Sequence, residues 1–302
     1  MKLLQRGNLF GYSLLFLLFF CGSTVAQPVA VTVDPAATAP GIQTVHGAHL
    51  AMYSADVPQQ NKLVLMIPGT NGTAAGCRVF DSSVAAMGYH VISIDYKNTV
   101  ITTVCSNSTD NDCFDLFRRE IILGTPVSSL VEVDSANSIV NRVTKLLQYL
   151  AANDAKGNWR TFLENGHPKW ENIITVGHSQ GAGHAAYLGK LFPVYKVLML
   201  SGPQDYLVHF SQPAGWQQQQ GVTPVSSYYA FLNRQDPFNM QYQLANAKVI
   251  MQTNAPDSLF VLPGEAVKGH PHILINDLDT KDHHGSTLDP RFVQVWNYVL
   301  TN

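Results

Sequence analysis

One serine stands between two glycines, at the point where an apolar stretch gives way to small residues. The pentapeptide GHSQG covers residues 177–181, follows the β-rich run 173–176 and precedes residues typical of a helix. A strand that turns sharply into a helix strains the backbone of such a serine and raises its Oγ above the sheet. Side chains at Gly177 and Gly181 would collide with neighbouring backbone across that turn. The helix dipole beneath Ser179 would also favour developing negative charge. We therefore predict that Ser179 is a nucleophile.

A serine hydroxyl attacks well only when a base takes its proton and a third group orients the base. With its strand–serine–helix motif, the chain resembles the α/β-hydrolase family, and the resemblance covers nearly all of the sequence after the amino-terminal segment. In this family the catalytic residues follow in the order serine, acid, histidine. The resemblance implies an acid after a later strand and a histidine just before the final helix.

The resemblance assigns the acid and the base to two downstream segments. Asp236, at the end of YYAFLNRQDPF, stands at the position of the family acid, and Asp205, closing LMLSGPQD, is the alternative. The segment DTKDHHGSTLDPRF precedes the last expected helix and holds both His283 and His284. We expect His284, which is next to Gly285, to be the base, with His283 as the alternative.

Acyl transfer also needs hydrogen-bond donors for the oxyanion. The backbone N–H of Gln180 is one donor by position, and the family draws the other from the loop after the strand LVLMI, here residues 68–72. Thr70 is the expected donor and Asn71 the alternative. The family often has His-Gly at the start of this loop, whereas this chain has Pro-Gly. Asn71 also begins the glycosylation pattern NGT, but a glycan there would crowd the loop, so we expect none.

The elements that must position these residues alternate along the chain. Apolar runs such as KLVLMI and YHVISIDY read as strands buried on both faces. Helical patterns, such as the amphipathic segment 133–154, alternate with runs of this kind along the chain. This alternation predicts an α/β fold with a mostly parallel central sheet and helices on both faces. The segment 206–224, with Phe210 and Trp216, reads as a flap over the site, which weakly favours an acyl or aromatic substrate.

The first residues have the layout of a secretory signal peptide. Lys2 and Arg6 precede a nearly unbroken apolar stretch, and small residues then lead to an expected cleavage after Ala26. An uncleaved membrane anchor is the alternative. We expect a secreted or periplasmic protein with a single domain over residues 27–302 and no stable membrane span. Cleavage leaves 17 of the 19 basic residues against 21 acidic ones, which does not suggest nucleic-acid binding.

Export makes disulfides feasible. Cys105 and Cys113 flank the polar loop SNSTDND and are the favoured pair, which leaves Cys77 as a buried thiol, although spacing alone does not exclude the other pairings. The region GHPHILINDLDTKDHH is rich in histidine and aspartate, but its spacing matches no standard ligand pattern. We therefore expect no metal and no cofactor.

The function that the resemblance implies is a serine hydrolase that cleaves a small or lipid-like carboxylic ester through an acyl-enzyme. An amidase, a thioesterase or an acyltransferase would use the same residues. Two other classes compete, a non-catalytic binding protein on a hydrolase scaffold and a metal-dependent hydrolase that uses the terminal histidines and aspartates. Fold alone does not decide among them.

Overall fold

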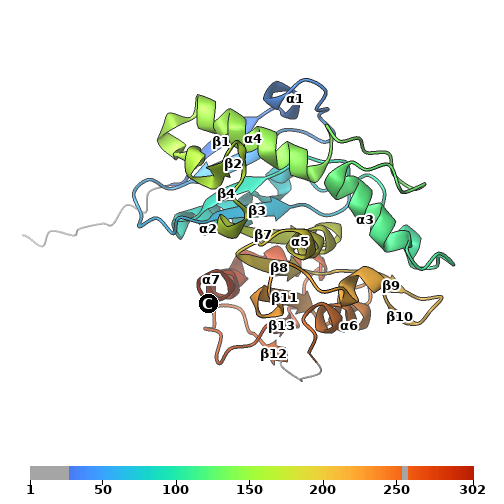
Figure 1. The fold of residues 1–302 in the computed structure, drawn as a ribbon. Coiled ribbons are helices and arrows are strands. Elements are labelled where there is room, and N and C mark those ends of the chain that lie inside the picture. The colour runs from blue at the N-terminus through green and yellow to red at the C-terminus, as the bar shows by residue number, and fades with distance from the viewer. Residues whose placement is uncertain (1–26, 254–257) are drawn as a thin grey trace, which may run out of the picture.

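One large sheet organises the protein. The computed structural model describes residues 27–253 and 258–302, so the predicted signal peptide lies outside the described residues. Nine strands of this part form a sheet in the order β1-β2-β4-β3-β7-β8-β11-β13-β12 (Figure 1). The pairs β1–β2 and β2–β4 are antiparallel, and every other pair is parallel. The predicted mostly parallel sheet is therefore confirmed.

The strands of this sheet are β1 (Val29–Val33), β2 (His49–Tyr53), β3 (Leu63–Ile67), β4 (His90–Ser93), β7 (Ile173–His178), β8 (Lys196–Leu200), β11 (Tyr228–Asn233), β12 (Ser258–Phe260) and β13 (Ile273–Asn276). Two short hairpins pair β5 (Leu163–Glu164) with β6 (His167–Pro168), and β9 (Tyr206–Leu207) with β10 (Gln212–Pro213). The α-helices are α1 (Pro35–Thr38), α2 (Arg78–Ala86), α3 (Cys113–Leu123), α4 (Ile139–Asn153), α5 (Gln180–Leu191), α6 (Met240–Ile250) and α7 (Val293–Thr301).

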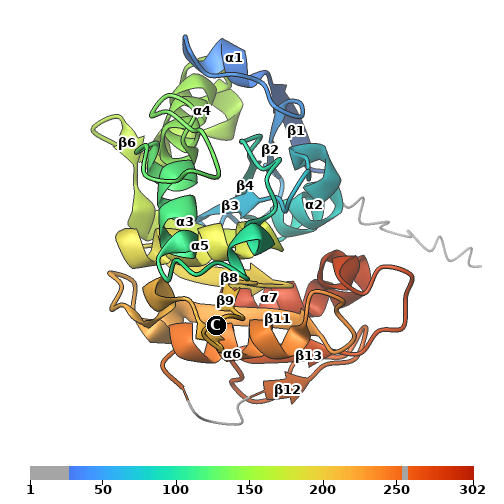
Figure 2. The ribbon, with the colours of Figure 1, turned by 90° about the vertical axis from the view of Figure 1, so that its right-hand side faces the viewer.

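Helices cover both faces of the sheet. Buried residues of α2 and α7 pack on one face, and those of α3, α4, α5 and α6 pack on the other (Figure 2). The central strands are correspondingly apolar, and all five residues of β3 are fully buried. A strand covered on both sides has no reason to alternate polar and apolar residues. The continuous apolar runs of the sequence are a consequence of this layering.

Three elements differ from the sequence-based expectation. Strand β13 was not predicted, because its four residues lie inside the His- and Asp-rich region, yet it pairs with β11 on one side and with the edge strand β12 on the other. Helix α4 begins at Ile139 and not near 133, because the Ser138 hydroxyl caps it by accepting from the Asn141 N–H. The last helix begins at Val293, after a 3-10 turn over Pro290–Phe292.

The expected flap is partly a core element. Trp216 is only 2% exposed, and its Nε1 donates to the Asp205 carboxylate at 2.9 Å. The prediction that Trp216 belongs to a flap over the site is therefore wrong. Phe210 is 38% exposed on the β9–β10 hairpin. A tryptophan among glutamines looks solvent-facing in the sequence, but a buried carboxylate gives its N–H a partner and holds it inside. Across the described ranges, no helix combines the length and apolar character that a membrane crossing needs.

His49 in β2 gives the fold an acid-sensitive point. The Asp95 N–H donates to His49 Nδ1 at 2.9 Å, so the proton of the neutral ring is on Nε2, which is buried and has no partner among the described residues. Burial first, and then the positive charge of Arg142, lower the pKa of His49 to about 3 from a usual 6.5. Between these two pH values the unfolded ring binds a proton and the folded ring does not, so stability rises with pH.

We predict that this histidine alone makes the free energy of unfolding fall by about 4 kcal/mol as the pH drops from 6.5 to 3. Urea unfolding at stepped pH measures the slope. His49→Asn keeps an acceptor for the Asp95 N–H and does not titrate, so its slope over this window should be shallower than that of the wild type. Equal slopes for the two proteins would contradict the prediction.

Candidate active site

The serine of the GHSQG segment occupies a strained turn between β7 and α5. Ser179 has φ +58° and ψ −122°, a backbone conformation rarely adopted by residues with a side chain. Its own N–H donates to the Leu200 carbonyl at 2.9 Å, which ties the turn to the neighbouring strand β8. The chain therefore holds this serine in a conformation that it would not adopt in a relaxed loop.

The flanking glycines make this turn feasible. A Cβ at Gly177 would lie 1.9 Å from the Gly181 carbonyl oxygen, and one at Gly181 would lie 2.0 Å from the Ile67 oxygen. Both contacts are with backbone, which has no room to move. Gly69 on the facing loop is similarly close, since its Cβ would lie 2.8 Å from the Cβ of Ser179. The glycines thus let three backbone segments meet around the serine.

His284 and Asp236 lie together beside this turn. His284 Nδ1 is 2.7 Å from Asp236 Oδ2, and the Asp236 side chain is fully buried. Burial opposes ionisation of Asp236, but the hydrogen bond and charge of His284 outweigh it, so the pKa of the carboxyl lies below its usual 3.8. The Phe238 N–H donates to Asp236 Oδ1 at 2.8 Å and fixes the carboxylate. An ionised acid so placed keeps the proton of the neutral ring on Nδ1.

The histidine loop is anchored to the serine turn through its backbone. The His284 carbonyl accepts hydrogen bonds from Ser201 Oγ at 2.6 Å and from His178 Nε2 at 3.0 Å. His178 precedes the serine, so the loop and the turn are joined directly. His284 Nε2 is buried and has no hydrogen-bond partner among the described residues, Ser179 included. A nucleophile–base hydrogen bond that is long in the free enzyme often tightens when substrate binds.

The two alternatives have other partners. His283 Nε2 lies 3.6 Å from the exposed carboxylate of Asp279. Asp205 accepts from Nε and Nη2 of Arg118, and both side chains of this ion pair are fully buried. The geometry therefore places His284 beside Asp236, and it pairs Asp205 with Arg118.

Arg118 is a residue that the sequence reasoning missed. Its Nη1 donates to the Gln180 carbonyl at 3.0 Å, so the Arg118–Asp205 pair supports the first turn of α5. A Cβ at Gly183 would lie 2.0 Å from the guanidinium, which explains a glycine inside this helix. The signal in the sequence is an arginine on the apolar face of α3, beside Phe114 and other core residues.

The loop over residues 68–72, which is expected to supply an oxyanion donor, leaves the Thr70 N–H without an acceptor among the described residues. The Asn71 N–H donates to the Asn98 carbonyl at 3.1 Å, which removes Asn71 from consideration as a donor. The N–H groups of Thr70 and of Gln180, the first residue of α5, have no acceptor within the part of the chain that the structure describes. Asn98 Nδ2 donates to the Gly69 carbonyl at 2.7 Å and fixes the loop. Both expected donors are thus available.

The cavity at the serine is small. It has a volume of about 10 Å³, and its lining residues are Thr70, Ile101, Thr102, Thr103, Ser179, Gln180, Gln204 and Phe238. The Phe238 ring also contacts the His284 ring, with centroids 4.5 Å apart. A volume of this size holds about one water molecule. The resting site therefore accepts a small group next to the serine.

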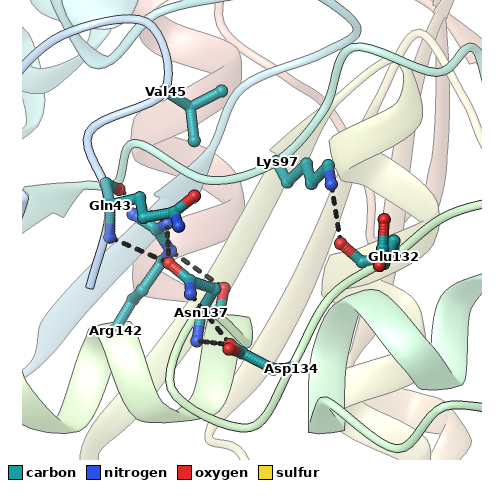
Figure 3. Close-up of a pocket in the computed structure, with 7 residues that line it drawn as sticks. All are labelled: Gln43, Val45, Lys97, Glu132, Asp134, Asn137 and Arg142. Atoms are coloured by element: carbon teal, nitrogen blue, oxygen red, sulfur yellow. Dashed lines mark hydrogen bonds between the residues drawn. The ribbon is translucent and has the colours of Figure 1, made fainter. Parts of the chain in front are cut away.

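A roomier pocket elsewhere does not contain these residues. It measures about 320 Å³ and is lined by Gln43, Val45, Lys97, Glu132, Asp134, Asn137 and Arg142 (Figure 3). Its polar groups largely satisfy one another: Arg142 Nη2 donates to Asn137 Oδ1, and Lys97 Nζ donates to the Glu132 carbonyl. It holds no nucleophile paired with a base, so size alone does not locate the chemistry.

A disulfide holds one wall of the serine cavity. Cys105 and Cys113, the pair favoured from the sequence, are bonded with their Cα atoms 5.5 Å apart, and Cys77 is a buried thiol. The bond joins the 3-10 turn Thr102–Cys105 to the first residue of α3. Three of the cavity-lining residues belong to this segment or directly precede it.

We predict that replacing both Cys105 and Cys113 with serine lowers the free energy of unfolding by about 2–3 kcal/mol, because the unfolded chain is no longer restricted by this short closed loop. Urea unfolding with and without dithiothreitol measures it. Reductant should destabilise the wild type by a similar amount and leave the double variant unchanged. A wild type indifferent to reductant would contradict the prediction.

The histidine- and aspartate-rich region does not gather into a metal site. Among residues 27–253 and 258–302, no three His, Cys, Asp or Glu side chains converge as metal ligands. Strand β13 runs through the region, and the His272 ring stacks on Tyr229 at 4.4 Å between centroids.

The strand order and the turn together define a known fold. A mostly parallel sheet with an antiparallel second strand, and a strained serine between glycines at the end of a central strand, is the α/β-hydrolase fold. No protein-family model and no curated protein matches the chain.

Solved structures similar to the chain are distant. A Klebsiella pneumoniae protein assigned as a dienelactone hydrolase is 10% identical, with 92% of this chain and all of that chain covered and a TM-score of 0.47. A hyperthermophilic esterase from the archaeon Pyrobaculum calidifontis is 11% identical, with 91% and 81% covered and a TM-score of 0.40. Likenesses this distant say nothing of activity, so the fold assignment depends on the topology of the chain itself.

Proposed function

We propose that this protein is a serine hydrolase that cleaves carboxylic esters, with Ser179 as nucleophile, His284 as base and Asp236 as orienting acid. The observation that carries the proposal is the 2.7 Å contact between His284 Nδ1 and Asp236 Oδ2, beside a strained serine. Fixing Nδ1 leaves Nε2 as the basic nitrogen, and Nε2 is the buried atom without a partner.

The proposed reaction has two stages. Ser179 Oγ attacks the ester carbonyl while His284 Nε2 takes its proton, and the same nitrogen then donates that proton to the departing alcohol. The backbone N–H groups of Gln180 and Thr70 stabilise the oxyanion. Water, deprotonated by His284, then attacks the acyl-enzyme and releases the carboxylic acid.

We further propose that the working protein is the single domain 27–302, exported after cleavage of residues 1–26. The disulfide between Cys105 and Cys113 supports an oxidising compartment. The one large sheet that runs through the described residues supports a single domain.

A fluorophosphonate probe, which phosphonylates activated serines, tests the proposal on the folded mature protein. Peptide mapping should find the label on Ser179 and should find none after heat denaturation. A chelator should leave ester hydrolysis unchanged, whereas a metal-dependent hydrolase would lose it. A folded protein without label on Ser179 would overturn the proposal.

A further inference from the structure

Two residues of the serine cavity keep a polar atom that the protein does not satisfy. Thr102 Oγ1 and Gln180 Nε2 are both buried, and neither has a hydrogen-bond partner among the described residues. Each residue is only 1% exposed, and both line the cavity that contains Ser179. A buried polar atom without a partner is costly, so its occurrence in a cavity points to a group that arrives from outside.

The Gln180 amide has one partner for its two polar atoms. Thr70 Oγ1 donates to Gln180 Oε1 at 2.6 Å, and this contact orients the side chain across the oxyanion loop. Nε2 is then left over as a donor of two hydrogens. Thr102 adds a hydroxyl that donates or accepts, from the turn on which the disulfide is built. Each of these two unsatisfied groups can therefore donate to an oxygen acceptor.

The cavity also indicates the charge and position of that acceptor. None of its eight lining residues is charged, so a carboxylate would find no countercharge there. The small volume leaves room only for a group close to the reacting carbonyl. Ile101 and Phe238 provide apolar surface in the same lining, which suits carbon atoms on either side of the acceptor.

We propose that the substrate is an ester with a neutral oxygen acceptor, such as an ether, hydroxyl or carbonyl oxygen, a few bonds from the scissile carbonyl. Gln180 Nε2 and Thr102 Oγ1 bind this oxygen. The inference depends on the proposed ester hydrolysis and names its substrate class. The acceptor belongs either to the acyl part or to the alcohol part of the ester, and the same chemistry serves both.

Two pairs of isosteric esters test the proposal on the mature protein. The acyl arm compares p-nitrophenyl methoxyacetate with p-nitrophenyl butyrate, and the alcohol arm compares 2-methoxyethyl acetate with n-butyl acetate in a pH-stat. Each kcat/KM is divided by the rate constant for hydroxide hydrolysis of the same ester, which removes intrinsic reactivity. We expect the oxygen-bearing ester to be favoured about tenfold in one arm, as one or two hydrogen bonds would give.

Thr102→Val, which replaces the hydroxyl with a methyl group, should lower the favoured ratio about three- to tenfold. Thr144→Val is the matched control, because Thr144 is buried in α4, its hydroxyl donates to the Val140 carbonyl of its own helix, and it does not line the cavity. The control should keep the wild-type ratio. An equal loss in both variants would mean that the ratio does not depend on the Thr102 hydroxyl and would overturn the assignment.

The outcomes separate the two proposals. Hydrolysis that needs Ser179 but shows ratios near one in both arms overturns the acceptor and leaves the serine hydrolase standing. Hydrolysis that survives Ser179→Ala overturns the proposed function, and the inference with it. If Thr102→Val does not fold, the ratios of the wild-type protein alone decide.

Discussion

Ser179→Ala should lower kcat for p-nitrophenyl ester hydrolysis by at least about 10⁴-fold and abolish fluorophosphonate labelling. The expected loss is large because the hydroxyl that forms the acyl-enzyme is removed, while the oxyanion donors support only residual catalysis by water. Alanine at this position still has to adopt φ +58°, so folding is to be checked by urea unfolding in parallel.

Ser83→Ala is the matched control for this substitution. The Ser83 hydroxyl donates to the Val79 carbonyl of its own helix and has no part in the site. Its variant should keep wild-type kcat and labelling. If Ser179→Ala retained more than a small fraction of wild-type activity while folding normally, another group would have to be the nucleophile.

Asp236→Asn should mainly lower activity, whereas Asp205→Asn should mainly lower stability. Asp236 orients His284, so its amide variant should lower kcat by about 10⁴-fold, because the wrong tautomer of the ring is favoured. Asp205 neutralises Arg118 in the core, so Asp205→Asn should lower the free energy of unfolding by about 3–5 kcal/mol. Steady-state kinetics and urea unfolding of both variants measure the two effects.

The contrast between these two aspartates decides the assignment of the acid. A folded Asp205→Asn protein should keep most of its kcat and an unchanged pH profile under conditions where it is stable. If Asp205→Asn folded but did not hydrolyse the ester, while Asp236→Asn remained active, Asp205 and not Asp236 would be the orienting acid. Asp277→Asn serves as a control for removal of one negative charge, since Asp277 is exposed.

Local signals in the sequence located much of the candidate site. The glycine spacing around Ser179 has a backbone cause, whereas Asp236 and His284, which the structure brings together, were assigned from the resemblance to the α/β-hydrolase family. The mostly parallel sheet followed from apolar runs with helices between them. The glycine spacing and the apolar runs have causes that act over a few residues, so both leave a mark in the pattern.

The features that sequence reasoning missed depend on long-range contacts. Arg118 and Asp205 are 87 residues apart, and nothing near either residue reveals the other. Strand β13 is four residues long, and its neighbours β11 and β12 make it a strand. Trp216 sits in a glutamine-rich segment, and only the buried Asp205 carboxylate explains its burial. Such features appear once the chain has closed on itself.

The buried arginine has a consequence for how the protein opens. The Arg118 guanidinium binds the Gln180 carbonyl and the Asp205 carboxylate, and it packs closely against Gly183. We therefore expect α3, α5 and the segment after β8 to come apart in one step. The serine turn should therefore not unfold locally at a low free energy. Its protected amides should exchange with solvent only when α3, α5 and the segment after β8 unfold cooperatively. In this protein, heat should disrupt the serine turn and the core in a single transition.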